Sequence, residues 1–191
     1  TPTISPTVDC DLGYLRIDWT DVKLQCNGSD DIYKYILFYK ETSDQDYTLI
    51  DSMSSNSTAY VNDNNGFISG CYKVAAIDKK LNVSLPSTEF CVDNCPIFEL
   101  PNIVTVNGDG VNDFYKAVRV RQIKEINLMI WDRWGALVYE TKNPYFKWDC
   151  ISKASNKLVS QGVFFYACEV YEPRLDGVKK RLLKGFLHVV K

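Results

Sequence analysis

The sequence predicts an all-β protein made of two consecutive β-sandwich domains. Short segments in which apolar and polar residues alternate with period two recur along the chain, and clusters of Gly, Asn, Asp and Pro separate them. The 191 residues are 46% apolar and 24% charged, which is sufficient for proper cores, and the length fits two units of roughly 100 residues each. No apolar run approaches the roughly 18 residues of a membrane helix, so we expect a soluble chain without direct membrane insertion.

Charge divides the chain into two halves. Residues 1–100 hold 7 Lys and Arg against 15 Asp and Glu, a net charge of −8, whereas residues 101–191 hold 15 against 9, a net charge of +6. The change falls at the short segment 91–101, whose two cysteines and two prolines predict a stiff junction. We expect one domain over residues 1–94 and a second over residues 95–191.

The strands of the first domain follow from its alternation. Leu15, Ile17 and Trp19 alternate with polar residues, and a Tyr-rich strand follows at residues 33–39. The further candidate strands are residues 47–51, 59–61, 71–77 and 88–92. With the closing residues 85–87, this pattern resembles a fibronectin type III domain over about residues 5–92. The resemblance implies a spacer or binding module without catalysis.

One tight loop and two hairpins organise the second domain. Residues 107–110, Asn-Gly-Asp-Gly, tolerate positive φ and predict a multiple turn. Residues 133–135, Arg-Trp-Gly, fit a three-residue hairpin loop with its glycine in the left-handed region. Asp176-Gly177 predicts a second hairpin, which joins residues 164–171 to residues 182–190. We expect the last strand to close the sheet.

The motifs of the second domain carry a family resemblance. They are residues 101–113, 126–140, 147–149, 160–166 and 184–190, in this order. The run closely resembles the gliding-motility-associated C-terminal domain, the type B sorting domain of the Bacteroidetes type IX secretion system, over about residues 99–191. Its family-motif positions are Asn107, Gly108, Asp109, Gly110, Asn112, Asp113, Trp148, Asp149, Gly162 and Tyr166. Val106 replaces the usual proline, and Cys150 replaces the glycine that generally follows Trp148-Asp149.

The resemblance implies a small Ig-like antiparallel sandwich that acts as a folded sorting signal. It places the protein at the cell surface or in the medium, after passage through the periplasm and the outer membrane. The implied partners are the outer-membrane secretion machinery, its translocon and its shuttle or sortase components. The chain opens at Thr1 without an initiator methionine or signal peptide, so we expect either a mature piece whose export signal was removed or a fragment of a longer parent chain, such as the end of a surface adhesin. We also expect a monomer.

The machinery is expected to read the exposed hairpin and a basic cluster near the last strand. The recognition candidates are Arg133, Trp134, Gly135, Lys179, Lys180, Arg181, Lys184 and Gly185. Two alternatives stay open, because the Trp134 ring can fold onto its own sheet and the basic side chains can form a plain solvated face.

The seven cysteines are typical of an extracytoplasmic protein, where thiols are oxidised. Strand adjacency narrows the many possible pairings. The expected pairs are Cys10 with Cys26, Cys71 with Cys91, and Cys95 with Cys168, which leaves Cys150 free. The main alternatives are Cys71 with Cys95 and Cys150 with Cys168.

Catalysis and bound metal are not expected. The single histidine, His188, lies in an apolar stretch and is expected to face solvent from a strand, and no acid pair or nucleophile with a base can be named. Calcium is a weaker alternative at Asn107, Asp109, Asn112 and Asp113, because this loop lacks the bidentate carboxylate of an EF-hand. We therefore expect a plain turn there and no cofactor.

Two further functions were weighed against sorting. The basic half lacks a clustered groove or a known motif for nucleic acid, so no nucleic-acid partner is expected. The stronger alternative is a surface adhesion or carbohydrate-binding module with no sorting role. Its ligand platforms would be exposed aromatic side chains such as Tyr33, Trp134 or Tyr145.

Overall fold

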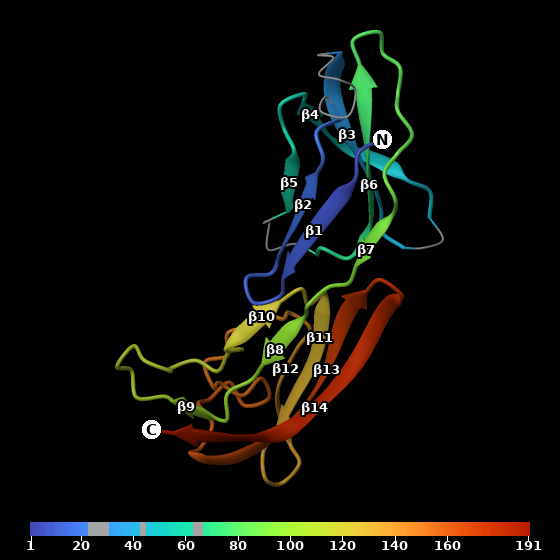
Figure 1. The fold of residues 1–191 in the computed structure, drawn as a ribbon. Coiled ribbons are helices and arrows are strands. Elements are labelled where there is room, and N and C mark those ends of the chain that lie inside the picture. Colours follow the sequence, from blue (N-terminus) through green and yellow to red (C-terminus); the bar gives the residue numbers. More distant parts are fainter. Residues whose placement is uncertain (23–30, 43–44, 63–66) are drawn as a thin grey trace. The chain divides into compact units, whose positions relative to one another are not determined.

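The computed structural model describes residues 1–22, 31–42, 45–62 and 67–191, and the elements of this part form four β-sheets (Figure 1). They fall into two compact units. The first unit is Thr1–Cys95 with Arg174–Gly177, and the second is Pro96–Pro173 with Val178–Lys191. The predicted all-β class is confirmed. Within the described residues, no helix combines the length and apolarity needed to cross a membrane.

The first unit contains a three-stranded and a four-stranded antiparallel sheet. The three-stranded sheet has the order β1 (Ile4–Asp9), β2 (Tyr14–Trp19) and β5 (Ala59–Asn62). The four-stranded sheet has the order β4 (Thr48–Ser54), β3 (Ile32–Lys40), β6 (Gly70–Asp78) and β7 (Phe90–Val92). Strand β1 was not predicted, because it is a mostly exposed edge strand interrupted by Pro6, a position that tolerates a missing N–H.

The core of the first unit follows the predicted alternation. Leu15, Ile17 and Trp19 are all buried on one face of β2. The Trp19 ring packs against the Tyr35 ring of β3, with centroids 5.5 Å apart. The Tyr35 hydroxyl donates to the Asp21 carboxylate at 2.9 Å and accepts the Val22 N–H at 3.1 Å. This buried pair of rings therefore joins the two sheets, and the Tyr35 hydroxyl has its hydrogen bonds satisfied.

Two disulfides join cysteines in the described part of the first unit. Cys71 and Cys91 are bonded as predicted, and they are direct partners in the register of β6 and β7. Cys10, just after β1, is bonded to Cys95, at a sequence separation of 85 residues. The entropy model assigns a loop of this length about 4–5 kcal/mol of stabilisation.

The other expected cysteine pairs were wrong. Cys95 is bonded to Cys10, so it pairs neither with Cys168 nor with Cys71, and Cys10 does not pair with Cys26. Cys26 itself lies outside the described residues. Cys168 is buried within the core of the second unit, where Cys150 is also buried, and both are free thiols. The prediction from adjacent strands was wrong for Cys10 and Cys95 because their disulfide joins the two ends of one domain, 85 residues apart in the sequence.

The second unit contains a two-stranded and a five-stranded sheet. In the two-stranded sheet β8 (Ile97–Glu99) pairs with β10 (Arg119–Arg121). The five-stranded sheet has the order β12 (Leu137–Thr141), β11 (Glu125–Trp131), β13 (Gly162–Arg174), β14 (Gly177–Val190) and β9 (Ile103–Thr105). Two corrections to the prediction follow. The pair of β14 and β9 is parallel, and β9 is the edge strand in place of the last strand β14.

The core of the second unit lies on one face of the five-stranded sheet. Ile126, Leu128 and Ile130 of β11 and Leu187 and Val189 of β14 point to this face and are buried. Aromatic side chains from outside this sheet cover it, namely Phe98 of β8 and, from segments between strands, Tyr115, Phe146 and Trp148. The period-two pattern thus defines an inner face and an outer face of this sheet.

Candidate functional site

The hairpin between β11 and β12 has the predicted three-residue loop. The Asp132 N–H donates to the Ala136 carbonyl at 2.9 Å, the Gly135 N–H donates to the Asp132 carbonyl at 3.0 Å, and Gly135 has φ of +84°. One carboxylate oxygen of Asp132 also accepts the N–H groups of Trp134 and Ala136, each at 2.9 Å. Asp132 therefore holds the loop from within, a role that the sequence analysis did not assign to it.

Trp134 stands at the tip of this hairpin and is 81% exposed. Its ring is not folded onto the sheet, which rules out that alternative. The Arg133 guanidinium lies 5.2 Å from the centroid of the Trp134 ring, so the two side chains form a cation–π pair at the surface. The hairpin tip presents a large apolar ring and a positive charge to solvent.

A cleft of about 390 Å³ lies beside the hairpin tip. It extends from the hairpin to the segment that leads into β13 and to the first residues of that strand. Its lining residues are Asp132, Arg133, Trp134, Val138, Ser152, Ser155, Lys157, Leu158, Val159, Ser160, Gln161, Gly162, Val163 and Phe164. Hydroxyl and amide side chains outnumber the charged ones on this lining, and all of the residues belong to the second unit.

The basic cluster on β14 is partly neutralised by ion pairs across to β13. Lys180 Nζ lies 3.0 Å from the Glu169 carboxylate, and Arg181 Nε lies 2.7 Å from the buried Glu172 carboxylate. The hydrogen bond from Lys180, reinforced by one from Tyr171, lowers the pKa of Glu169. Two of the four predicted cations thus bind carboxylates of their own sheet.

The structure gives a packing reason for glycine at position 185, which the sequence did not reveal. A Cβ atom at this position would lie 2.6 Å from the Tyr166 hydroxyl oxygen and 2.7 Å from its Cζ atom. The Tyr166 ring on β13 therefore occupies the space above the glycine of β14. Such an aromatic cover over a strand glycine accounts by packing for Gly185, a recognition candidate, and for Tyr166, a family-motif position.

Two cations of the predicted basic cluster lie away from the hairpin end of the sheet. Trp131, the last strand residue before the hairpin, is opposite Phe165 near the start of β13, whereas Lys180 and Arg181 contact Glu169 and Glu172. The separation along β13 is four to seven residues, or about 13–23 Å at the rise of an extended strand. Gly185 is nearer the hairpin end, because it lies against Tyr166, the partner of Ile130. The structure therefore does not bring the hairpin into one site with Lys180 and Arg181.

An apolar outer face of the five-stranded sheet was missed by the sequence analysis. Trp131 is opposite both Leu137 and Phe165, so the three side chains share this face, and Phe165 is 51% exposed. On β14 Phe186 is 49% exposed and contacts the ring of the exposed His188 edge-on. The signal was present in the continuous apolar runs of β13 and β14, which predict strands with two apolar faces.

The 107–113 loop is a set of nested turns closed by its own side chains. The Asp113 carboxylate accepts the N–H groups of Gly108 and Gly110, each at 2.7 Å. Asp109 accepts the Val111 N–H at 2.7 Å and a bond from the Asn107 amide at 2.9 Å, and these bonds lower the pKa of Asp109. Because backbone and amide groups take these oxygens, the loop geometry is explained without calcium.

The motif around Trp148 builds the core and a tight turn. The Trp148 ring is buried and stacks on the Tyr139 ring, with centroids 5.1 Å apart, and its Nε1–H donates to the Ile151 carbonyl at 2.9 Å. The Asp149 carboxylate accepts the Ile151 N–H at 3.0 Å. Cys150 has φ of +61°, in the left-handed region that favours glycine, which explains why glycine is usual there. Gly162, with φ of +146°, also uses glycine's freedom.

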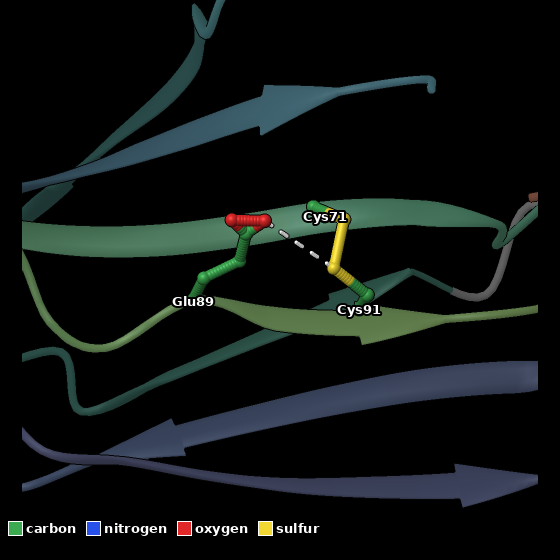
Figure 2. A group of neighbouring side chains, drawn as sticks. All are labelled: Cys71, Glu89 and Cys91. Atoms are coloured by element: carbon green, nitrogen blue, oxygen red, sulfur yellow. Dashed lines mark hydrogen bonds between the residues drawn. A yellow bond between two sulfur atoms is a disulfide. The ribbon is translucent and has the colours of Figure 1, made fainter. Parts of the chain in front are cut away.

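Cys71, Glu89 and Cys91 form a compact group in the first unit that resembles a metal site only in composition. Figure 2 shows the disulfide between the two cysteines, with the Glu89 carboxylate pointing toward it. Both sulfurs are used by the disulfide, and a Glu89 oxygen lies 3.2 Å from Lys40 Nζ. The group is a cross-strand covalent tie with a neighbouring ion pair, and it offers no thiolate ligand.

Comparisons with known proteins address the second unit most directly. Residues 98–189 match the family model described as CHU_C Type IX secretion signal domain, which is just under half of the chain. The match supports a sorting-signal role for this part of the chain and indicates export across the outer membrane to the cell surface or the medium. A comparison with curated proteins gives no match.

Several solved β-sandwich structures are similar to the chain at low TM-scores. An Fn3-like protein from Clostridium thermocellum is 20% identical, with 46% of this chain and 84% of that chain covered and a TM-score of 0.34. The CbhA fibronectin(III)-like modules of Clostridium thermocellum are 16% identical, with 100% and 94% covered and a TM-score of 0.29. The chicken CNTN1 FN1-FN3 domains are 9% identical, with 100% and 65% covered and a TM-score of 0.37. The fold class rests on the strand pairing described above.

Proposed function

We propose that the second unit is a type B sorting domain of the gliding-motility-associated kind, read as a folded signal by the type IX secretion machinery. The match of residues 98–189 to a type IX secretion signal domain carries this proposal. The partners are the translocon and the shuttle or sortase components at the outer membrane. The family-motif residues support the folded form of the signal, because Trp148 and Tyr166 pack within the domain and the 107–113 loop closes on its own side chains.

The recognition surface in this proposal is the hairpin tip together with the outer face of the five-stranded sheet. The Arg133 and Trp134 pair is exposed, and Phe165 and Phe186 leave large apolar surfaces uncovered within the described part of the second unit. Contiguous exposed apolar surface on a small domain is a common mark of protein contacts. The ion pairs of Lys180 and Arg181 make the basic cluster the weaker candidate, because these cations are already bound to carboxylates.

The first unit acts as a spacer in this proposal. Its cysteines are joined in two disulfides within the described residues, as suits a chain that functions outside the cytoplasm. The alternative, an adhesion module with no sorting role, would place the activity in the first unit or on exposed aromatic side chains. Its test is ligand binding by the first unit alone.

The decisive experiment is an export assay. A signal peptide and a fluorescent protein are fused to residues 96–191, or to residues 1–191 as a positive control, and are expressed in cells with and without a working type IX system. Release or surface display that requires the system supports the sorting role. Periplasmic retention of both fusions in both strains would overturn it.

Two matched variants locate the recognition surface. Trp134→Ala removes the exposed ring of the hairpin tip, and Tyr145→Ala removes another exposed ring of the same unit that lies outside the cleft. We expect export to fall with Trp134→Ala and to remain with Tyr145→Ala. Equal export of both variants, with both folded, would remove the hairpin from the recognition surface.

A further inference from the structure

The cleft beside Trp134 distinguishes this side chain from the other exposed aromatic residues considered as ligand platforms. Tyr33 is exposed on β3 of the first unit and Tyr145 is exposed in the second unit, but neither lines the cleft. Trp134 is more exposed than either and lines a cleft of about 390 Å³. An exposed ring at the rim of a cleft can cover a ligand while the other walls bind its edges.

Part of the cleft lining is polar and has no partner within the described residues. Ser155, Lys157, Ser160 and Gln161 line the cleft, and their side chains make no hydrogen bond or ion pair to any other residue that the structure describes. Val159 and Phe164 also line it and are buried. The lining therefore offers two hydroxyl groups, a carboxamide and an ammonium group for a ligand, beside buried apolar side chains.

The hairpin side of the cleft is held in place before any ligand arrives. Asp132 uses one carboxylate oxygen to bind the N–H groups of Trp134 and Ala136, which fixes the backbone beneath the ring. The Arg133 guanidinium, 5.2 Å from the ring centroid, adds a second contact. A platform fixed in this way loses little conformational freedom on binding, which favours affinity.

These features match a saccharide better than a peptide. A sugar ring has an apolar C–H face for the indole and a rim of hydroxyl groups that both donate and accept hydrogen bonds, as serine and glutamine side chains do. A peptide bound as an added strand needs an unpaired strand edge. The pairing of β13 with β11 begins at Phe165, so the part of β13 at the cleft without a β11 partner is limited to Gly162–Phe164. On the edge strand β12 the Val138 carbonyl, at the cleft, already accepts the Lys153 N–H at 3.1 Å.

We propose that this cleft is a saccharide-binding site. One sugar ring stacks on Trp134, and its hydroxyl groups bond to the lining residues Ser160 and Gln161. The volume is at the lower end of the range of about 300–1,000 Å³ for small-molecule sites, which limits the bound portion to one or two sugar units. Lys157 and Arg133 give the cleft two cations against the single carboxylate of Asp132, so an acidic sugar is bound more tightly than its neutral counterpart.

The test uses the purified chain of residues 1–191 on an array of neutral and acidic oligosaccharides, followed by calorimetry with the best-bound oligosaccharide. Trp134→Ala is expected to weaken binding at least tenfold. Gln161→Ala removes a polar group from the cleft lining, and we expect binding to weaken severalfold. Tyr145→Ala is the matched control and should bind as the parent does. Near-ultraviolet circular dichroism establishes that each variant is folded.

Three outcomes would overturn the proposal. The first is an array on which the parent chain binds no oligosaccharide, and the second is binding that Trp134→Ala leaves unchanged. The third is binding of a peptide library with the same dependence on Trp134 and no binding of sugars. The assay contains no secretion machinery, so its result is independent of the export experiment, and either proposal can fail without the other.

Discussion

The substitution Gly185→Ala tests whether Gly185 is needed for its packing against Tyr166 and not for recognition. The added Cβ atom would lie 2.6–3.0 Å from three atoms of the Tyr166 side chain, where ordinary contacts are about 3.5–4.0 Å. The Tyr166 ring must therefore move by up to about 1 Å within a packed neighbourhood. Overpacking of this kind costs about 1–3 kcal/mol, and the better strand propensity of alanine returns about 0.5–1 kcal/mol.

The expected net loss is about 1–2 kcal/mol of the free energy of unfolding. For a unit of about 95 residues this corresponds to a fall in Tm of about 5–15 °C. Removal of the Tyr166 ring should reverse the sign of the effect of Gly185→Ala on stability. In a Tyr166→Ala background the obstructing ring is gone, so Gly185→Ala should stabilise the domain by about 0.5 kcal/mol, and the coupling between the two sites should be about 2 kcal/mol.

The assay is differential scanning calorimetry of the parent, both single variants and the double variant. Gly135→Ala serves as the control, because its φ of +84° is strained for alanine while no atom lies within 4 Å of the added Cβ. Gly135→Ala should cost about 1 kcal/mol independently of Tyr166. An unchanged Tm for Gly185→Ala, or an equal loss in both backgrounds, would refute the explanation by packing.

Three other expectations concern thiols, acid and the hairpin. Burial raises the pKa of Cys150 and of Cys168 to about 12. In a Cys26→Ser variant of the chain, these two thiols should therefore resist a thiol reagent at pH 8 and should be labelled only after unfolding. The pKa of Glu169 is lowered in the folded chain. Its contribution to the free energy of unfolding is therefore present above the unfolded pKa of about 4.5 and is lost as pH falls through the folded pKa. Glu169→Gln should flatten the acid limb of a plot of unfolding free energy against pH, and an unaltered limb would contradict this. Asp132→Ala leaves two loop N–H groups without their acceptor, so urea unfolding should show a loss of about 1–2 kcal/mol in the free energy of unfolding. An unchanged free energy of unfolding in this variant would show that the loop does not need the carboxylate.

The recognition candidates show where prediction from sequence succeeded. The hairpin loop was predicted correctly, with Gly135 in the left-handed region, because a three-residue loop between two alternating segments depends on a few neighbouring residues. Trp134 is exposed at its tip as expected. Gly185 was assigned to recognition because the ring that covers it, Tyr166, lies on another strand and leaves no trace in the neighbouring sequence.

The site itself was only half predictable. The sequence identified the hairpin, but the cleft also needs Ser160 and Gln161, which are 26 and 27 residues beyond Trp134 in the sequence. The outer face of the sheet likewise needs the pairing of Trp131 with Phe165. Such surfaces form only when the strand order is known, and many orders are compatible with one set of strands.

Local backbone preference was sufficient to determine the all-β class, the alternating faces of β2 and β11, and both hairpins. These features depend on residues close together in the chain, so the pattern alone contains them. The tertiary structure alone decided the disulfide between Cys10 and Cys95 and the parallel pairing of β9 with β14. Those contacts join distant residues, and they are selected by the packing of a whole unit, in which every strand limits the positions left to the others.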